Sequence, residues 1–146
     1  MNNTQTVTVK NSGATFTPTA LADFLSDKIL RHIDISLEKC TILDPACGDG
    51  ALLSSIAKKI DNAFDFELQG YETNLDYLLE ANNNLSLYLS DNQYKIIHED
   101  FLDVAKPNSF DLFSVASKHE FSDIVIANPP YVRTEILGAE KSQQIA

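Results

Sequence analysis

Apolar residues recur at helical spacing in three segments of this chain. In the first segment, the repeating positions are Leu21, Phe24, Leu25, Ile29, Leu30 and Ile33. In the second, they are Leu52, Leu53, Ile56, Ala57 and Ile60. This spacing is typical of helices with one buried face, and Pro18 suits the first turn of the first helix. We therefore predict helices over residues 18–35, 51–60 and 74–89.

Short apolar runs lie between these helices and predict strands. The runs cover residues 41–44, 66–72, 94–98 and 123–127, and a loop-rich stretch at 103–121 precedes the last of them. Strands that alternate with helices imply right-handed crossovers and a parallel sheet. The predicted fold class is therefore α/β, with flanking helices and a four-stranded parallel sheet.

The length and charge of the chain limit its organisation and partners. Its 146 residues suit one domain, and we expect a polar segment at residues 1–14 followed by that domain at 15–146. The formal net charge is -10. A protein that holds nucleic acid on its own surface usually has the opposite charge. Either the substrate is not nucleic acid, or the part that holds nucleic acid lies elsewhere.

Membrane insertion and metal binding are not expected from this sequence. No apolar run approaches the roughly 18 residues that span a bilayer, and the polar start Met1-Asn2-Asn3-Thr4 does not resemble a signal peptide. No further cysteine or histidine cluster supports a zinc site or disulfide at Cys40 and Cys47. We expect a cytoplasmic protein with no metal site.

A glycine-rich loop follows the first predicted strand. It reads Asp44-Pro45-Ala46-Cys47-Gly48-Asp49-Gly50, and no Lys or Arg occurs between Thr41 and Ala57. Glycines allow close approach of the backbone to a ligand, and the helix that follows offers free N–H groups. A phosphate-binding loop would be expected to carry cations. The acidic loop instead suits a cationic ligand without phosphates, such as S-adenosylmethionine, although a plain tight turn would also explain the glycines.

Acidic residues also end the second and third predicted strands. Glu72 at the tip of the second strand is suited to accept hydrogen bonds from both ribose hydroxyls of a nucleoside. Asp100 can accept a hydrogen bond from the amino group of adenine, and the adjacent Phe101 can cover the ring. Simpler roles remain open, because Glu72 could be a solvated acid before a helix and Asp100 a simple cap. Three acids around one glycine loop nevertheless favour a shared ligand.

The last predicted strand runs into Asn128-Pro129-Pro130-Tyr131. In an open α/β sheet, ligands bind at the carboxyl ends of the strands. If the amide oxygen of Asn128 and the carbonyl of Pro129 both accept from a planar amine, its nitrogen becomes more tetrahedral and its lone pair can point at a methyl group. The two prolines limit backbone freedom and Tyr131 offers a stacking face. A proline-rich exit without chemical meaning is the alternative.

Together these motifs resemble the S-adenosylmethionine-dependent DNA adenine-N6 methyltransferases of bacterial restriction–modification systems, in the gamma order of motifs. The resemblance covers about residues 13–133. It implies a Rossmann-like class I methyltransferase fold in which the four strands of this chain have the spatial order 3-2-1-4, with S-adenosylmethionine as cofactor. The positions it implies for cofactor binding are Thr15, Phe16, Thr17, Pro18, Asp44, Pro45, Ala46, Cys47, Gly48, Gly50, Glu72, Asp100, Phe101 and Asn128. The positions it implies for catalysis are Asn128, Pro129, Pro130 and Tyr131.

The chain departs from this family at its end. Members continue through further strands and a target-recognition domain, whereas this sequence stops 15 residues after Tyr131. We therefore expect the N-terminal portion of a longer enzyme, which binds cofactor but is inactive alone. Double-stranded DNA would be held by the missing basic part. Strand 123–127 would lie at a sheet edge and favour self-association.

Three other functions remain open. Protein glutamine-N5 methyltransferases also use an Asn-Pro-Pro-Tyr motif, but their glycine loop resembles DLGTGSG. They also lack the threonine–proline motif that precedes the loop in the adenine-N6 family and that Thr17-Pro18 matches here. The chain could alternatively belong to an RNA base-amine methyltransferase, which would transfer a methyl group to an amine by similar chemistry. The piece could also be a cofactor-binding module without turnover.

Overall fold

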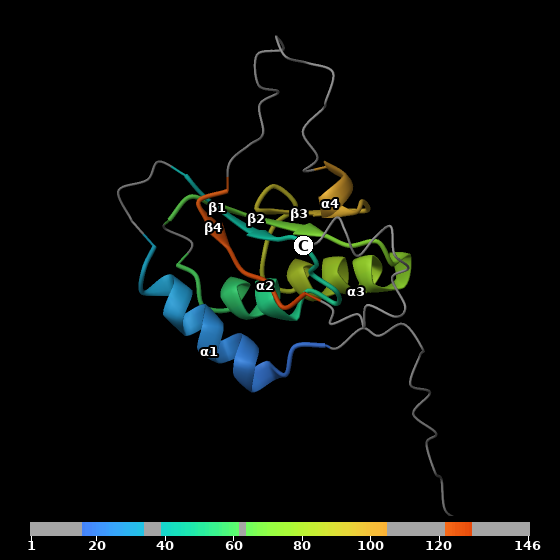
Figure 1. The fold of residues 1–146 in the computed structure, drawn as a ribbon. Helices are drawn as coiled ribbons and strands as arrows, with labels where there is room; N and C mark the ends of the chain where they lie inside the picture. The colour runs from blue at the N-terminus through green and yellow to red at the C-terminus, as the bar shows by residue number, and fades with distance from the viewer. Residues whose placement is uncertain (1–15, 34–38, 62–63, 105–121, 130–146) are drawn as a thin grey trace, which may run out of the picture. The chain divides into compact units, whose positions relative to one another are not determined.

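Four helices and four strands make up the described part of the chain, which comprises residues 16–33, 39–61, 64–104 and 122–129 of a computed structural model (Figure 1). The helices are α1 (Thr19–Leu30), α2 (Ala51–Ala57), α3 (Leu75–Ser86) and α4 (Phe101–Val104). The strands are β1 (Cys40–Asp44), β2 (Phe66–Tyr71), β3 (Tyr94–Ile97) and β4 (Ile124–Val125). The strands alternate with helices along the sequence, as predicted.

The four strands form one parallel sheet in the order β3-β2-β1-β4 (Figure 1). Ile42 of β1 is paired with Leu68 of β2 on one side and with Ile124 of β4 on the other. The first strand, β1, is central in the sheet, the next two strands extend the sheet outward through β2 and β3, and β4 pairs with the other side of β1. The α/β class and the strand order predicted from the sequence are therefore confirmed.

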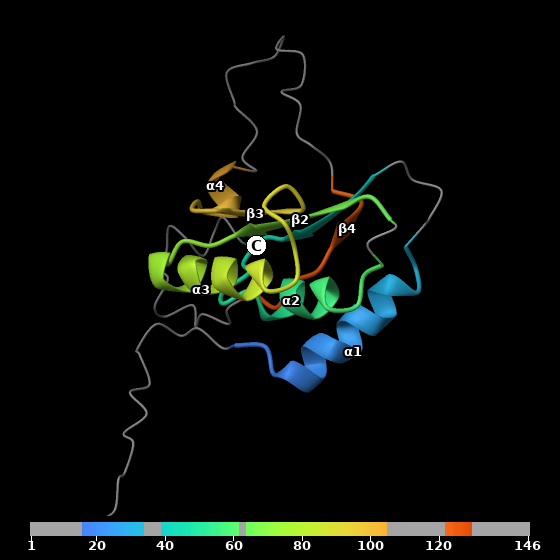
Figure 2. The ribbon, with the colours of Figure 1, turned by 180° about the vertical axis from the view of Figure 1, so that it is seen from behind.

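Helices α1, α2 and α3 lie on one face of the sheet (Figure 2). Every residue of α2 from Leu52 to Ala57 is buried, because this helix packs against both the sheet and its two neighbouring helices. A helix that is covered on all sides is apolar around most of its circumference. Ser54 is an exception in α2, because its Oγ is buried and has no hydrogen-bond partner among the described residues. Leu53 and Ile56 of α2 lie in the core with Ile42 and Leu68 of the sheet, and all four are fully buried.

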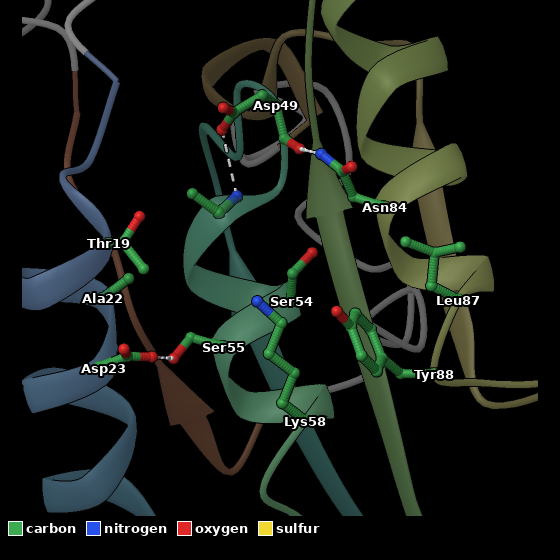
Figure 3. Close-up of a pocket in the computed structure, with 11 residues that line it drawn as sticks. Thr19, Ala22, Asp23, Asp49, Ser54, Ser55, Lys58, Asn84, Leu87 and Tyr88 are labelled. Atoms are coloured by element: carbon green, nitrogen blue, oxygen red, sulfur yellow. Dashed lines mark hydrogen bonds between the residues drawn. The ribbon is translucent and has the colours of Figure 1, made fainter.

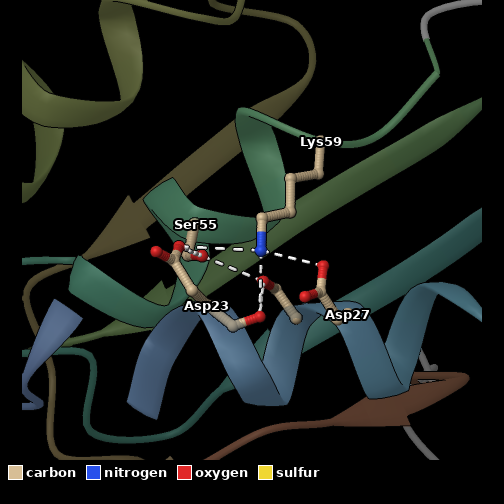
Figure 4. Close-up of polar contacts among 5 residues, drawn as sticks. Asp23, Asp27, Ser55 and Lys59 are labelled. Carbon is tan, nitrogen blue, oxygen red and sulfur yellow. Dashed lines mark hydrogen bonds and ion pairs between the residues drawn. The ribbon is translucent and has the colours of Figure 1, made fainter. Parts of the chain in front are cut away.

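The contact between α1 and α2 includes a network of polar side chains (Figure 4). Ser55 Oγ donates a hydrogen bond to Asp23 Oδ1 at 2.6 Å and lies 2.9 Å from Ser26 Oγ. Lys59 Nζ donates to the backbone oxygen of Asp23 and to Asp27 Oδ1, both at 2.9 Å. These bonds fix the position of α1 on α2 more specifically than apolar packing would, because each donor requires a defined acceptor.

The elements differ in detail from the sequence prediction. Helix α1 ends at Leu30 and α2 at Ala57, earlier than residues 35 and 60, and residues 34–38 lie outside the described part. Strands β2 and β3 each end one residue early. Strand β4 contains two residues where five were predicted, although backbone bonds from Asp123 to Thr41 and from Ile126 to Leu43 extend the pairing. Helix α4 was not predicted, because a single helical turn has no readable apolar period.

Cys40 and Cys47 are both buried and both are free thiols. Among the helices of the described residues, none is long and apolar enough to cross a membrane.

Candidate functional site

The predicted site residues from four strands converge on one edge of the sheet. Because all strands are parallel, their carboxyl ends lie along the same edge. Asp44 is the last residue of β1 and Glu72 directly follows β2. Asp100 follows β3, and Asn128 follows β4. This edge is where open α/β sheets bind their ligands.

The glycine loop between β1 and α2 is held against the end of β2. The backbone N–H of Cys47 donates to the carbonyl of Tyr71 at 2.9 Å, and that of Gly50 donates to Cys47 at 2.8 Å. Gly48 and Gly50 both have positive φ angles, of 55° and 76°. Both positions require the left-handed conformation, which is strained for residues with a side chain. The loop shape therefore depends on these two glycines.

We predict that Gly50→Ala destabilises the protein more than Gly48→Ala does. A Cβ at position 50 would lie 3.0 Å from Ala81 Cβ of α3, whereas nothing lies within 4 Å of a Cβ at position 48. The free energy of unfolding should fall by about 1–2 kcal/mol for Gly48→Ala, the cost of a left-handed L-residue. Gly50→Ala should lose roughly 1–3 kcal/mol more from overpacking. Urea denaturation of both variants measures this difference, and equal losses would contradict the role of Ala81.

Glu72 fastens the glycine loop to the start of α3. Its Oε2 accepts from the backbone N–H of Gly48 at 3.0 Å, and its Oε1 accepts from that of Asn74 at 2.7 Å. Glu72 therefore precedes a helix, as the simpler interpretation allowed, and also contacts the loop. Each carboxylate oxygen has two lone pairs, so both can accept a further bond from a ligand hydroxyl.

Asp44 is the most deeply buried carboxyl at this edge, with 1% of its surface exposed. Its Oδ1 accepts from the backbone N–H of Ala46 at 3.1 Å. Burial raises the pKa of Asp44 to about 7, and the nearby charge of Glu72 adds to the rise. Burial also raises the pKa of the Cys47 thiol to about 12, so that this thiol stays protonated at neutral pH. A positively charged ligand at this loop would favour the ionised form of Asp44.

Asp100 and Phe101 lie at the start of α4. Asp100 Oδ1 accepts from the backbone N–H of Leu102 at 2.9 Å, so Asp100 acts as a helix cap, one of the two roles that the sequence left open. The ring of Phe101 packs edge-on against Tyr71, with centroids 5.2 Å apart. This contact places the aromatic ring of Phe101 beside Tyr71, the last residue of β2.

The segment before α1 meets the residue after β4. Asn128 Nδ2 donates to Thr17 Oγ1 at 3.1 Å, although 111 residues separate them in the sequence. Phe16 packs edge-on against Tyr77 of α3, with ring centroids 5.1 Å apart. The predicted site residues Thr15, Pro130 and Tyr131 lie outside the described residues.

The structure adds residues that the sequence analysis did not assign to the site. Gly70 in β2 allows a close approach, because a Cβ there would lie 2.8 Å from Cys47 Sγ and from Ile96 Cδ1 and would require these side chains to move. A glycine inside an apolar strand often marks such a close approach, so this signal was present in the sequence. Tyr71 and Tyr77 support Phe101 and Phe16, and no local pattern indicates those pairings.

A separate pocket of about 160 Å³ lies between α1, α2 and α3 (Figure 3). Its lining includes Asp23, Asp49, Lys58, Asn84 and Tyr88. Asp49 is the one residue of the glycine loop that lines it, and none of the individual positions predicted for cofactor binding does. The pocket belongs to the helical layer, whereas the predicted site residues lie at the strand ends, and we therefore place the candidate site at the sheet edge.

Comparison with known families agrees with this geometry. A family model described as N-6 DNA methylase matches residues 1–145. The chain belongs to the N-6 DNA methylase family. The type II methyltransferase M.BanIII of Aneurinibacillus aneurinilyticus is 37% identical in an alignment of 145 positions that covers 94% of this chain and 25% of that protein. The chain thus spans about a quarter of the length of this relative.

Solved structures confirm the fold. A type I restriction–modification methyltransferase subunit from Streptococcus thermophilus matches 85% of this chain and 26% of its own, with a TM-score of 0.63 and 19% identity. A Listeria monocytogenes protein described as a class I S-adenosylmethionine-dependent methyltransferase matches 82% of this chain and 33% of its own, with a TM-score of 0.61 and 20% identity. The N-6 DNA methylase chain therefore has the class I methyltransferase fold that the sequence predicted.

Proposed function

We propose that this chain binds S-adenosylmethionine and forms the catalytic part of an enzyme that methylates the N6 amino group of adenine in DNA. The observation that carries this proposal is the position of Asn128 at the carboxyl end of β4, on the edge where Asp44 and Glu72 also lie. Family membership supports the reaction class. The relative's description as a type II methyltransferase supports a place in a bacterial restriction–modification system, which would act in the cytoplasm.

The residues of this edge fit the proposed cofactor. The glycine loop is acidic and contains no Lys or Arg, and the buried Asp44 has a carboxyl that a cation would help to ionise. S-adenosylmethionine would supply a methyl group carried on a positively charged sulfur. Gly48 and Gly50 would lie against it, Glu72 would accept from its ribose hydroxyls, and Phe101 would cover its adenine ring.

Asn128 would hold the substrate amine. The lone pair of an aromatic amine is delocalised into the ring, so the nitrogen is a poor nucleophile. Acceptance of its two hydrogens by Asn128 Oδ1 and the Pro129 carbonyl would draw the nitrogen toward tetrahedral geometry. Its lone pair would then be free to attack. The base would have to leave the duplex to reach this edge, and Tyr131 would stack against it.

Glu72→Ala is expected to weaken S-adenosylmethionine binding by about 1–3 kcal/mol, because charge-assisted hydrogen bonds to the ribose are lost. The same substitution frees the N–H groups of Gly48 and Asn74. Glu72→Gln is the matched control, since its amide oxygen still accepts from one of them. Calorimetry should place Glu72→Gln between the wild type and Glu72→Ala, and unchanged affinity in Glu72→Ala would contradict the ribose assignment.

We further propose that the chain works as one part of a longer enzyme. It spans about a quarter of its curated relative, and its net charge of -10 is unsuited to gripping a duplex. The DNA-holding surface would therefore lie in another part. The isolated chain should bind cofactor but should not methylate DNA.

Methyl transfer from labelled S-adenosylmethionine tests the proposed function. The substrates are an unmethylated DNA duplex, an unmodified RNA and a glutamine-containing peptide, each offered to this chain and to the full-length protein. N6-methyladenine formed in DNA by the full-length protein is the expected product. Label in RNA or in glutamine would instead support the alternative methyltransferases, and cofactor binding without any product would indicate a binding module.

We also propose that the chain self-associates through β4. Among the described strands, only β1 pairs with β4, and the Val125 side chain is 60% exposed. An open strand edge with apolar side chains is a template for pairing with a second copy. Light scattering should show a mass that rises with concentration, and Val125→Lys should reduce it. A monodisperse monomer at high concentration would contradict this proposal.

A further inference from the structure

We propose that the Thr17 hydroxyl is a positioning group for Asn128. It would hold the side-chain amide with its NH₂ toward residue 17 and its oxygen free for the substrate amine. The carrying observation is the 3.1 Å hydrogen bond from Asn128 Nδ2 to Thr17 Oγ1. This inference rests on the proposed function, because it gives Asn128 Oδ1 the task of accepting from the amine.

An asparagine amide has a donor end and an acceptor end of nearly the same shape. Rotation by half a turn exchanges them, and a reversed Asn128 would present its NH₂ to the NH₂ of the substrate. Two donors facing each other repel, so only one orientation supports the reaction. A fixed acceptor on the donor side favours that orientation before the substrate arrives. Such preorganisation is the main way that a polar site lowers a reaction barrier.

The fold fixes Thr17 from both sides. Pro18 directly follows it, and the Pro18 carbonyl accepts from the backbone N–H groups of Leu21 and Ala22 at the start of α1. Phe16 directly precedes it and packs on Tyr77 of α3. Thr17 itself is partly buried, and its β-branched side chain has few χ1 choices. The hydroxyl therefore has a restricted position.

Helix α1 in turn is fastened to α2 by the polar network of Asp23, Ser55 and Lys59 (Figure 4). The glycine loop leads directly into α2. The hydroxyl of Thr17 and the loop proposed to hold the cofactor are thus carried by two helices in fixed contact. A correctly oriented Asn128 amide would then face the bound cofactor without further rearrangement.

Three variants of Thr17 and a matched control at Thr19 separate this role from others. Thr17→Val removes the hydroxyl while keeping the branched shape, and Thr17→Ser keeps the hydroxyl. Thr19→Val makes the same chemical change two residues later, at an exposed position that lines the separate pocket. Thr17→Ala is the second variant without a hydroxyl, to be used if circular dichroism shows that Thr17→Val has lost its fold.

The first measurement does not depend on methyl transfer. It follows the signal of the Asn128 side-chain amide by nitrogen-15 NMR in this chain. The signal is identified by its absence in Asn128→Ala. Solvent exchange of the hydrogen-bonded Nδ2 proton should rise roughly two- to tenfold in Thr17→Val, the effect of losing one hydrogen bond. Thr17→Ser and Thr19→Val should keep the slow exchange. A threonine hydroxyl can also donate, so an Nδ2 signal that is unchanged in Thr17→Val would overturn the proposed direction of the bond.

The second measurement compares the same variants in the full-length protein. With saturating cofactor and DNA, kcat should fall roughly 10- to 100-fold in Thr17→Val, as expected when a reacting group is misplaced. The resemblance placed Thr17 among the cofactor-binding positions, whereas a hydroxyl that acts on Asn128 alone leaves the dissociation constant for S-adenosylmethionine unchanged in Thr17→Val. Thr17→Ser should restore kcat. A weaker cofactor affinity with normal kcat would overturn the proposal and make Thr17 a cofactor contact. If the wild-type protein binds no S-adenosylmethionine, the proposed function is refuted. The NMR result would still test the hydrogen bond between Asn128 Nδ2 and Thr17 Oγ1.

Discussion

Replacement of Asn128 by alanine is expected to lower kcat for methyl transfer by roughly 100- to 1000-fold in the full-length protein, the range seen when a transition-state hydrogen-bonding group is removed. The proposed role of the Asn128 oxygen explains the size of this effect. The lone pair of the amine becomes available only while its hydrogens are held out of the ring plane. Asn128→Ala leaves one of two acceptors, so the amine would return toward its unreactive planar form.

Cofactor binding should remain nearly normal in Asn128→Ala. In this structure the side chain of Asn128 contacts Thr17, whereas the glycine loop follows β1 and Glu72 follows β2. Asn83→Ala is a matched control, because Asn83 is an exposed asparagine of α3. Single-turnover kinetics and calorimetry together measure the two effects. Full activity of Asn128→Ala would refute the proposed mechanism.

Asp44→Asn is expected to stabilise the cofactor-free protein at pH 8 by up to about 4 kcal/mol, from a rise in pKa of about 3 at 1.36 kcal/mol per unit. Asp44 is a buried carboxyl whose ionisation is costly, because its environment has little water and lies near Glu72. Asparagine keeps the acceptor for the N–H of Ala46 without carrying the charge.

The effect has a defined dependence on pH. Burial raises the pKa of Asp44 from 3.8 to about 7, so the folded protein binds more protons than the unfolded chain between these values. The contribution of the protonated Asp44 to the free energy of unfolding is fully present below about pH 4 and is lost as the pH rises through about 7. The difference between the wild type and Asp44→Asn should therefore grow from pH 4 to pH 7 and then level off. Urea denaturation across this range measures it, and a difference that is independent of pH would contradict the assignment.

The same substitution should impair cofactor binding. If Asp44 attracts a positively charged ligand, Asp44→Asn should weaken S-adenosylmethionine binding by about 1–3 kcal/mol above pH 7, the value of a hydrogen bond to a charged group. Binding to the wild type should strengthen as the pH rises through about 7, with release of a proton. Calorimetry in buffers of different ionisation enthalpy detects that proton. The opposing effects on stability and binding would identify Asp44 as a functional rather than a structural residue.

The sequence by itself determined the class of the fold and the order of its strands. The helical period around Leu53 and Ile56 and the apolar run at Ile42 set the type of each element, because local periodicity reports which side of an element is buried. Right-handed crossovers then permitted the order 3-2-1-4. The glycine loop and Asn128 could also be assigned to one sheet edge, since the carboxyl ends of parallel strands coincide. Element ends were less well predicted, as for β4, because they depend on pairing with β1.

Tertiary structure alone decided which side chains meet. The bond between Thr17 and Asn128 joins residues 111 positions apart, and the bond between Glu72 and Gly48 joins two different strand ends. The raised pKa of Asp44 likewise depends on how completely its surroundings exclude water. Local sequence patterns carry no information about such distances or about the depth of burial, because both arise only when separate elements pack together. The residue types of the site are therefore readable from the chain, whereas their hydrogen bonds and charge states are properties of the packed fold.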